Sequence, residues 1–303
     1  MYSFEIFISK NNKMGIIQTA LGIEPKLVKD NIYTPSNAAI KSMVSKISNY
    51  DHTQFEHPYQ GKKLKILIIG TEHDELIMEN GKKFLTGNHP IELFVPMLHL
   101  QNAGFDFDFA TPTGQAIKIE NWAFPEEDQD VNEIYQKYQY QIQHPLNLND
   151  IVQNLNQDSN YIAVFIPGGH GVLIDLPESI AVKKVIQWSK DFDKYLITLC
   201  HGPAAFIATS LDNSKRKYPY HGYKIVAFPD GMDKLLPSIG YLPGKMPMFF
   251  GEMLQELGIS VINKVAIGNI NKDRKLITGD GPLAANELGK LAALELLNSI
   301  SEN

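Results

Sequence analysis

The chain has 303 residues, 44% of them hydrophobic and 20% charged, and a formal net charge of −6 at pH 7. One large core or two modest ones fit this length, and neither disulfides nor metal ions are needed as staples. The single cysteine excludes a disulfide framework and a cysteine-rich zinc site, and it fits a reducing compartment. The negative charge argues against general binding to nucleic acid, and no apolar run reaches the ~20 residues that span a bilayer. We therefore predict a soluble, cytoplasmic protein that binds no membrane.

Residues 1–60 differ in composition from the rest of the chain. They show weak periodicity and are rich in Asn, Ser, Lys and Pro, which is typical of an extension or a lid. We assign residues 61–303 to the α/β domain that holds the chemistry.

Within that domain, short buried strands alternate with amphipathic helices. Strands are predicted at Leu64–Gly70, Phe105–Ala110, Tyr161–Ile166, Tyr195–Leu199, Tyr223–Phe228, Ser260–Asn263 and Lys275–Thr278. Helices are predicted at about Pro90–Gly104, Pro177–Lys190, Pro247–Gly258 and Pro282–Asn298. This alternation predicts an α/β fold with a flavodoxin-like parallel sheet sandwiched by helices.

One connection breaks the rhythm of strands and helices. Residues of about 115–158 are rich in Gln, Asn, Asp, Glu and Tyr, and they separate two predicted strands by far more than a normal connection. Connections of this length usually have a function or form a small subdomain. We predict a small cap insertion here.

The only cysteine, Cys200, follows the predicted strand Tyr195–Leu199 and precedes His201 and Gly202. A side chain at a sharp strand-to-helix turn is pushed out of the sheet edge, and the next helix offers N–H groups and a positive dipole end that favour a thiolate. We expect an ionised, unburied thiol at the mouth of a pocket, with His201 as its partner or base. The alternative is a buried packing cysteine, and the local string alone does not decide between them.

A glycine-rich turn, Pro167–Gly171, follows another predicted strand. Because parallel strands end at one edge of the sheet, this turn is expected near Cys200. The N–H groups of Gly169 and His201 would then stabilise negative charge on a carbonyl oxygen. Gly168 and His170 are candidate pocket residues, although a tight turn and an exposed histidine explain the string equally well. It is not a phosphate loop, since the Lys and Ser/Thr of such loops are missing.

Together, Pro167–Gly171 and Leu199–Pro203 resemble the PfpI-like superfamily of the class I glutamine amidotransferase-like fold. Further strings resemble its HchA branch of bacterial chaperone, glyoxalase III and deglycase proteins: Thr86–Glu92, Asn121–Ala123, Ala227–Asp230, Lys272–Asp280 and Ala284–Ala292. The resemblance covers residues of about 57–298.

The resemblance implies roles for individual residues. Cys200 matches the nucleophile, His201 and Asp233 match the other members of the proposed triad, and Glu92 matches the acid that hydrogen-bonds the thiol and handles protons. It implies a homodimer and a reaction that needs no cofactor. The substrates it implies are small 2-oxoaldehydes such as methylglyoxal, or their early adducts on amines and thiols.

The resemblance also points to a metal position at which this chain departs from the pattern. Members of the branch can hold zinc with two histidines and a carboxylate, and the matching residues here are Gln101, Asp106 and Tyr138. An amide and a phenol are poor replacements for imidazole on zinc. We predict no zinc at this place, with His144 as the residue that would compensate if the match shifts within the insertion.

Several functions are compatible with these residues. A glyoxalase III-type lyase, which converts methylglyoxal to lactate, and a deglycase use the same residues, so the sequence does not separate them. A holdase chaperone for unfolded proteins is the alternative and needs exposed apolar surface. A cysteine peptidase is less favoured, because the predicted cap would crowd a polypeptide. A glutamine amidotransferase is disfavoured, since its histidine comes from much later in the chain.

Overall fold

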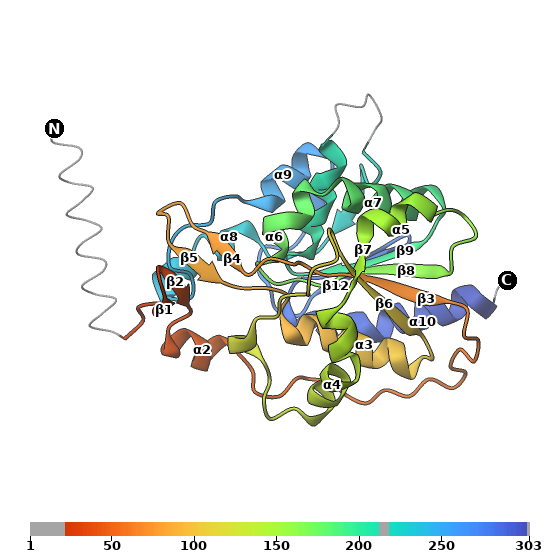
Figure 1. The fold of residues 1–303 in the computed structure, drawn as a ribbon, viewed down its shortest axis with the longest axis horizontal. Helices are drawn as coiled ribbons and strands as arrows, with labels where there is room; N and C mark the ends of the chain where they lie inside the picture. The colour runs from red at the N-terminus through yellow and green to blue at the C-terminus, as the bar shows by residue number, and fades with distance from the viewer. Residues whose placement is uncertain (1–21, 212–217, 302–303) are drawn as a thin grey trace.

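The computed structural model describes residues 22–211 and 218–301, so residues 1–21 of the predicted extension lie outside the described residues. Its centre is a seven-stranded sheet in the order β12-β13-β9-β8-β3-β6-β7 (Figure 1). All strand pairs in it are parallel except the hairpin of β12 with β13. The strands are β3 (Lys65–Ile69), β6 (Asp106–Thr111), β7 (Leu146–Asn147), β8 (Tyr161–Ile166), β9 (Tyr195–Leu199), β12 (Ile270–Asp273) and β13 (Leu276–Gly279).

The sequence of the central strands explains their position. β8 and β9 match the predicted bounds, and β3 differs by one residue at each end, because these runs are apolar, β-branched and buried on both faces. Strand pairing then aligns β3, β8 and β9 so that their carboxyl ends meet at one edge. The predicted α/β fold with a parallel sheet between helices is confirmed.

Helices cover both faces of the sheet. In Figure 1, α3, α4 and α10 lie on one side, and α5, α6, α7 and α9 lie on the other. Each face has its own buried apolar cluster. The α-helices are α2 (Asn37–Met43), α3 (Pro90–Asn102), α4 (Gln129–Gln143), α5 (Leu148–Asn154), α6 (Val172–Asp175), α7 (Ile180–Asp191), α8 (Asp230–Asp233), α9 (Phe250–Glu256) and α10 (Ala285–Ser301).

Some predicted helices are shorter or wound differently. The segment after Cys200 is a 3-10 helix, Gly202–Ser210, and not an α-helix. A 3-10 turn, Leu176–Glu178, precedes α7, and another, Pro282–Ala284, precedes α10. Both contain a proline in the first turn, where no N–H is needed. Further 3-10 turns are Asn121–Ala123 and Leu236–Ile239, and no described helix is long and apolar enough to span a membrane.

Part of the predicted extension is ordered into a second, four-stranded sheet. Its order is β1-β2-β5-β4, which brings two N-terminal strands beside the hairpin that follows β3. The strands are β1 (Lys26–Lys29), β2 (Ile32–Thr34), β4 (Glu75–Ile77) and β5 (Lys83–Leu85). A separate two-residue pair, β10 (Lys224–Ile225) with β11 (Ser260–Val261), occupies two regions predicted as longer strands.

The insertion of about 115–158 packs along the main domain. Helix α4 lies against α3, β7 joins the edge of the main sheet, and α5 contacts α7. The division into extension, domain and cap stays a prediction, but this packing places the helices of the insertion beside the core faces.

Candidate active site

Cys200 sits in a strained turn at the carboxyl end of β9. Its φ of 56° lies in the left-handed region, which a non-glycine residue rarely adopts. The turn is fixed on both sides, because the Cys200 N–H donates to the Gly279 carbonyl (2.9 Å) and its carbonyl accepts from the Phe228 N–H (3.0 Å). This geometry turns the thiol away from the sheet and toward the side chains that follow the neighbouring strands.

The structure brings Cys200, His201 and Asp233 into one chain of contacts. Sγ lies 3.2 Å from Nδ1 of His201, and Nε2 of His201 lies 2.9 Å from Oδ2 of Asp233, at the end of α8. An aspartate can only accept here, so the network assigns the proton to Nε2. Nδ1 of His201 is then unprotonated, and its lone pair faces the thiol, as a general base requires.

His170 occupies the other oxygen of the same aspartate. Its Nε2 lies 3.1 Å from Oδ1 of Asp233, and its ring centroid is 4.1 Å from that of His201. Burial alone would raise the pKa of Asp233, but the two imidazoles outweigh it and lower that pKa. The sequence offered His170 as a pocket residue; the structure places its imidazole on Asp233, where it holds the carboxylate.

Glu92 lies in the first turn of α3 and is fully buried. Neither oxygen receives a hydrogen bond from an N–H or O–H group of the described residues. Burial therefore raises the pKa of Glu92 well above its usual range, opposed by contact with the Cys200 thiol. The raised pKa favours the protonated form of Glu92, and a protonated carboxyl beside a sulfur is a hydrogen-bond donor and a proton source.

The expectation of an unburied, ionised thiol is wrong for this structure. Cys200 is only 5% exposed, and burial, followed by the adjacent Glu92, raises the pKa of its thiol. The short 3-10 helix after it does not offset this desolvation. The resting state is therefore a neutral thiol, which must lose its proton when substrate arrives.

The glycines of the Pro167–Gly171 turn permit this close packing. A Cβ at Gly168 would collide with Oε2 of Glu92 and with Cβ of Cys200, so a side chain at 168 would force the acid and the thiol apart. Gly169 has a φ of 104°, and a Cβ there would strike the backbone of Gly87. The backbone N–H groups of Gly169 and His201 have no hydrogen-bond acceptor among the described residues. They are therefore available to donate to an oxygen atom of a ligand.

Sequence reasoning missed three residues around this centre. Glu120 is buried and accepts a hydrogen bond from Thr86 Oγ1 (2.6 Å). Burial raises the pKa of Glu120, and this rise is opposed by His170, whose backbone N–H also donates to Glu120. Tyr241 lies 6.0 Å, centroid to centroid, from His170, and Phe228 stacks on His201 at 4.9 Å. Phe228 belongs to a string that marked the resemblance, but only tertiary packing places Glu120 and Tyr241 here.

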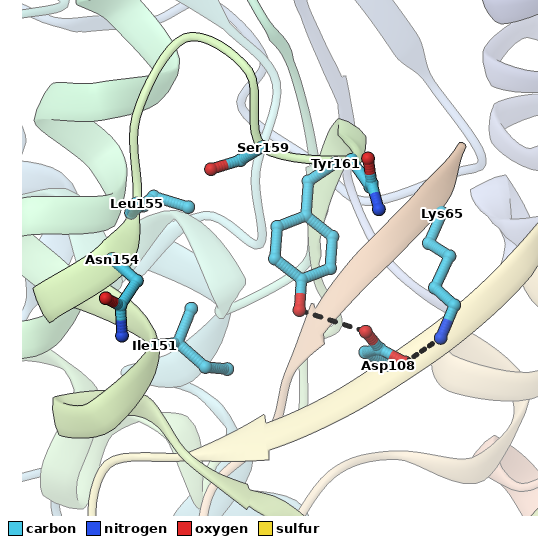
Figure 2. Close-up of a pocket in the computed structure, with 8 residues that line it drawn as sticks. Lys65, Asp108, Ile151, Asn154, Leu155, Ser159 and Tyr161 are labelled. Carbon is cyan, nitrogen blue, oxygen red and sulfur yellow. Dashed lines mark hydrogen bonds and ion pairs between the residues drawn. The ribbon is translucent and has the colours of Figure 1, made fainter. Parts of the chain in front are cut away.

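Two cavities differ in how near they lie to the Cys200 centre. One, of about 470 Å³, lies between residues 42–49 and the segments that surround Cys200, and its lining includes His89 and Phe228. The other, of about 280 Å³, lies at the opposite edge of the sheet, where Lys65 and Tyr161 begin their strands (Figure 2). There Asp108 accepts from Lys65 (2.7 Å) and Tyr161 (3.0 Å), so its polar groups pair with each other.

The residues at the family's metal position do meet, but as a hydrogen-bonded cluster. Tyr138 Oη lies 3.3 Å from Oε1 of Gln101 and 3.4 Å from Oδ1 of Asp106, and Lys137 Nζ donates to the same Oε1 (2.5 Å). An amide, a phenol and a nearby ammonium do not fit zinc. His144 lies outside this cluster, with its ring tilted against that of the exposed Tyr140 (centroids 4.8 Å apart).

Two other groups within the described residues have donor atoms close enough for a metal ion. One is His170, His201 and Asp233, whose Nε2 atoms already bond the carboxylate. The other is the set of Glu72, His73 and Asp175, in which both Glu72 oxygens are occupied by Thr113 and Gln115. In both groups, donor atoms that a metal ion would need already take part in hydrogen bonds.

No protein-family model matches the chain. The protein/nucleic acid deglycase HchA of Escherichia coli O157:H7 is 45% identical over 281 residues, which is 93% of this chain and 98% of the relative; the protein of strain K12/DH10B matches equally.

Solved structures share the fold. Glyoxalase III of Candida albicans has a TM-score of 0.60 and 21% identity, covering 77% of this chain and 97% of its own. The Rapid Encystment Protein 24 kDa of Francisella tularensis has a TM-score of 0.63 and 21% identity, covering 77% and 99%. At the identity and coverage of its Escherichia coli relatives, the chain belongs to the HchA deglycase family.

Proposed function

We propose that this protein is a cofactor-independent glyoxalase III-type lyase and deglycase. It converts methylglyoxal to lactate and acts on early oxoaldehyde adducts of proteins or nucleotides. The observation that carries the proposal is the chain of contacts from Asp233 through His201 to the Cys200 thiol, with buried Glu92 on its other side. Membership of the HchA deglycase family supports it independently.

The first step is addition of the thiol to the aldehyde. Nδ1 of His201 takes the thiol proton while Sγ bonds to the aldehyde carbon, and the carbonyl electron pair moves onto oxygen. The N–H groups of Gly169 and His201 stabilise that oxygen. It then takes the proton of Glu92 to become the hydroxyl of a hemithioacetal, which leaves Glu92 as a carboxylate. Asp233 keeps Nε2 of His201 protonated and stabilises the imidazolium that forms.

The second step moves hydrogen between the two carbons. A base removes the C1 proton to give an enediol, and protonation at C2 leaves a thioester of a 2-hydroxy acid on Cys200. The Glu92 carboxylate accepts the C1 proton and returns it to C2, because burial raises its pKa and so strengthens it as a base. Water then cleaves the thioester, so that C1 is oxidised, C2 is reduced and one water is consumed.

An adduct reaches the same intermediate. When Sγ attacks the carbon that bears the hydroxyl and the amine or thiol, the bond to that amine or thiol breaks and the hemithioacetal forms on Cys200. The leaving nitrogen or sulfur takes the proton that His201 removed from Sγ. The later steps are identical. This shared route explains why one set of residues serves both activities.

The test separates the two activities. Adducts of methylglyoxal with N-acetylcysteine are prepared, freed of excess methylglyoxal and mixed with wild type or Cys200→Ser. A deglycase removes adduct faster than the adduct dissociates on its own, whereas a lyase alone cannot exceed that rate. Loss of adduct at the same rate in both proteins would remove the deglycase half of the proposal.

A holdase chaperone is the second candidate, favoured by one observation. The outer strands of the four-stranded sheet, β1 and β4, expose Leu27 (58%), Val28 and Ile77. Exposed apolar residues on sheet edges suit contact with unfolded chains. If Cys200→Ser suppresses the aggregation of a heat-denatured client as well as wild type does, this activity is independent of the thiol.

The remaining functional assignments belong to the same proposal. A homodimer is implied by the family resemblance, and a cytoplasmic location fits a lone thiol in a reducing compartment. A cysteine peptidase stays the least favoured function. The Cys200 thiol is buried, and the nearby cavity is lined by residues 42–49 and by no residue of the insertion that the sequence suggested as a cap.

A further inference from the structure

The 470 Å³ cavity lies beside segments that contact the Cys200 turn. Its floor includes Phe228, whose ring stacks on His201 at 4.9 Å and whose N–H bonds the Cys200 carbonyl. Its side wall includes His89 and Ile91, which immediately precede Glu92 in the chain. Asp280 is also in the lining, and it follows Gly279, whose carbonyl accepts the Cys200 N–H. The cavity thus borders the segments that carry the proposed catalytic residues, while Cys200, His201, Glu92 and Asp233 themselves are outside its lining.

The volume exceeds what methylglyoxal requires. A three-carbon dicarbonyl bonded to Sγ fills a small part of a cavity this large, which falls within the range of about 300–1,000 Å³ typical of pockets for much larger ligands. The unused space lies between the catalytic segments and residues 42–49.

The lining selects an uncharged, largely apolar group. Ile91, Phe228, Met232 and Leu283 contribute apolar side chains, and the described lining includes no Lys, Arg or Glu. The one carboxylate, Asp280, is fully buried and already accepts the N–H groups of residues 267–269. A cationic substituent would therefore find no free anion, and an anionic one would find no cation.

One polar group points to a ligand with a hydrogen-bonding atom. His89 is 7% exposed, makes no cap hydrogen bond to α3 and leaves Nδ1 without a partner among the described residues. Burial lowers the pKa of His89 to about 3, so its ring is neutral.

The outer wall is held in place by specific bonds. The Ser48 N–H donates to Oδ2 of Asp128 (2.7 Å), and Nδ2 of Asn49 donates to the Leu283 carbonyl (3.2 Å) across the cavity rim. Residues 42–49 therefore form a fixed wall over the site.

We propose that this cavity binds the substituent on the ketone carbon of the substrate, and that the preferred substituent is an uncharged aromatic ring. The substrate class is then the arylglyoxals and adducts bearing the same group, with phenylglyoxal as the simplest probe. This inference rests on the proposed lyase function. Val44 is the residue of the N-terminal wall whose enlargement tests it, because its backbone is extended (φ −105°, ψ 123°) and accepts any L-residue.

The experiment compares kcat/KM for phenylglyoxal and methylglyoxal in wild type, Val44→Trp and Ala266→Phe, which fill the cavity from opposite walls. Ile47→Trp is the matched control, since Ile47 is on the same segment, 56% exposed and outside the lining. We expect wild type to prefer phenylglyoxal. Each filling variant should lower its kcat/KM at least about tenfold, while methylglyoxal changes less than about twofold.

The outcomes separate this inference from the function on which it rests. If wild type turns over neither dicarbonyl, the proposed function fails. If methylglyoxal is turned over but wild type does not prefer phenylglyoxal, or the filling variants reduce both substrates equally while remaining folded by thermal melting, the cavity does not hold the substituent. If one filling variant unfolds, the other decides.

Discussion

Glu92 and Cys200 form a buried pair, and no Lys or Arg is among the groups that shift the pKa of either. Two negative charges cannot share this space, so at most one of the two groups is ionised near neutral pH. Transfer of the thiol proton to Nδ1 of His201, beside a protonated Glu92 carboxyl, is therefore the simplest description of the pair. It explains how a buried thiol acts as a nucleophile without a permanently low pKa.

Glu92→Gln tests the proton-handling role at constant charge. The amide keeps a donor beside Sγ but cannot exchange a proton, so kcat on methylglyoxal should fall about 10²–10⁴-fold while the melting temperature stays within a few degrees. Glu120→Gln is the matched control, because its amide oxygen still accepts from Thr86. Steady-state kinetics with more than about a tenth of wild-type kcat in Glu92→Gln would contradict this role.

His170 acts through Asp233 as a positioning residue. Losing a hydrogen bond to a buried carboxylate costs about 1.5–3 kcal/mol, so His170→Leu should reduce kcat/KM about 10–100-fold and displace the acid limb of its pH profile. His170→Gln retains an N–H donor and should restore most of the activity. Equal losses in both variants, with an unmoved profile, would mean that the ring only fills space.

The sequence predicts the centre of this site better than its surroundings. Cys200 and Gly168 follow buried strands, and parallel strands end together, so their proximity follows from the fold class. The ionisation state of the thiol was predicted wrongly, because the pattern shows a turn before a helix but not the burial around it. Glu120 and Tyr241 come from irregular segments, whose placement depends on long-range packing.

At the scale of elements, α3, β6 and α4 meet at the cluster of Gln101, Asp106, Lys137 and Tyr138. Hydrogen bonds join these elements at the place where the family resemblance implied a metal position. Gln101, Asp106 and Tyr138 lie close together, as the match to the family predicted, because Tyr138 and not His144 contacts Asp106. We therefore expect the junction to be stable without zinc.

The double substitution Gln101→His with Tyr138→His should convert this cluster into a zinc site of two imidazoles and a carboxylate. Metal analysis after incubation with zinc and gel filtration should give about one zinc per chain in the double variant, and its melting temperature should rise with zinc. Wild type should retain none at this place. Stoichiometric zinc in wild type that is lost in Asp106→Asn would contradict the assignment.

Elements with strong patterns are predicted well, and short ones are not. β8 and β9 are continuous apolar runs, whereas β4 and β5 have three residues each. They are strands because they pair with each other and because β5 also pairs with β2. β12 was missed for a related reason, since its half-buried residues lack a regular alternation. Local pattern carries little information where tertiary pairing decides.

At the scale of the whole molecule, the N-terminal region contributes to both stability and the site. Lys290 bonds Asp51 (2.8 Å), and Asn286 links Asp51 to His99 of α3, so residues following the cavity wall are tied to α10 and α3. The composition of residues 1–60 suggested an extension or a lid, but it gave no indication of which residues would line the 470 Å³ cavity.

Global stability should depend on pH through Asp175. Burial raises its pKa to about 6 from an ordinary value of 3.8. The unfolded chain therefore releases this proton first, and stability is lost as the pH rises from about 4 through 6. Asp175→Asn should remove that loss, so its advantage over wild type in urea unfolding should grow by up to about 3 kcal/mol between about pH 3.5 and 7.5. A difference that does not change with pH would refute this origin.

The most direct test of the whole account is the conversion of methylglyoxal by the purified chain without added glutathione or metal, followed by NMR. Wild type should convert the dicarbonyl to lactate in equal molar amount, and Cys200→Ser, which removes the only sulfhydryl of the chain, should give none above the buffer rate. Lactate formation at the same rate in wild type and Cys200→Ser would contradict the central role of that thiol.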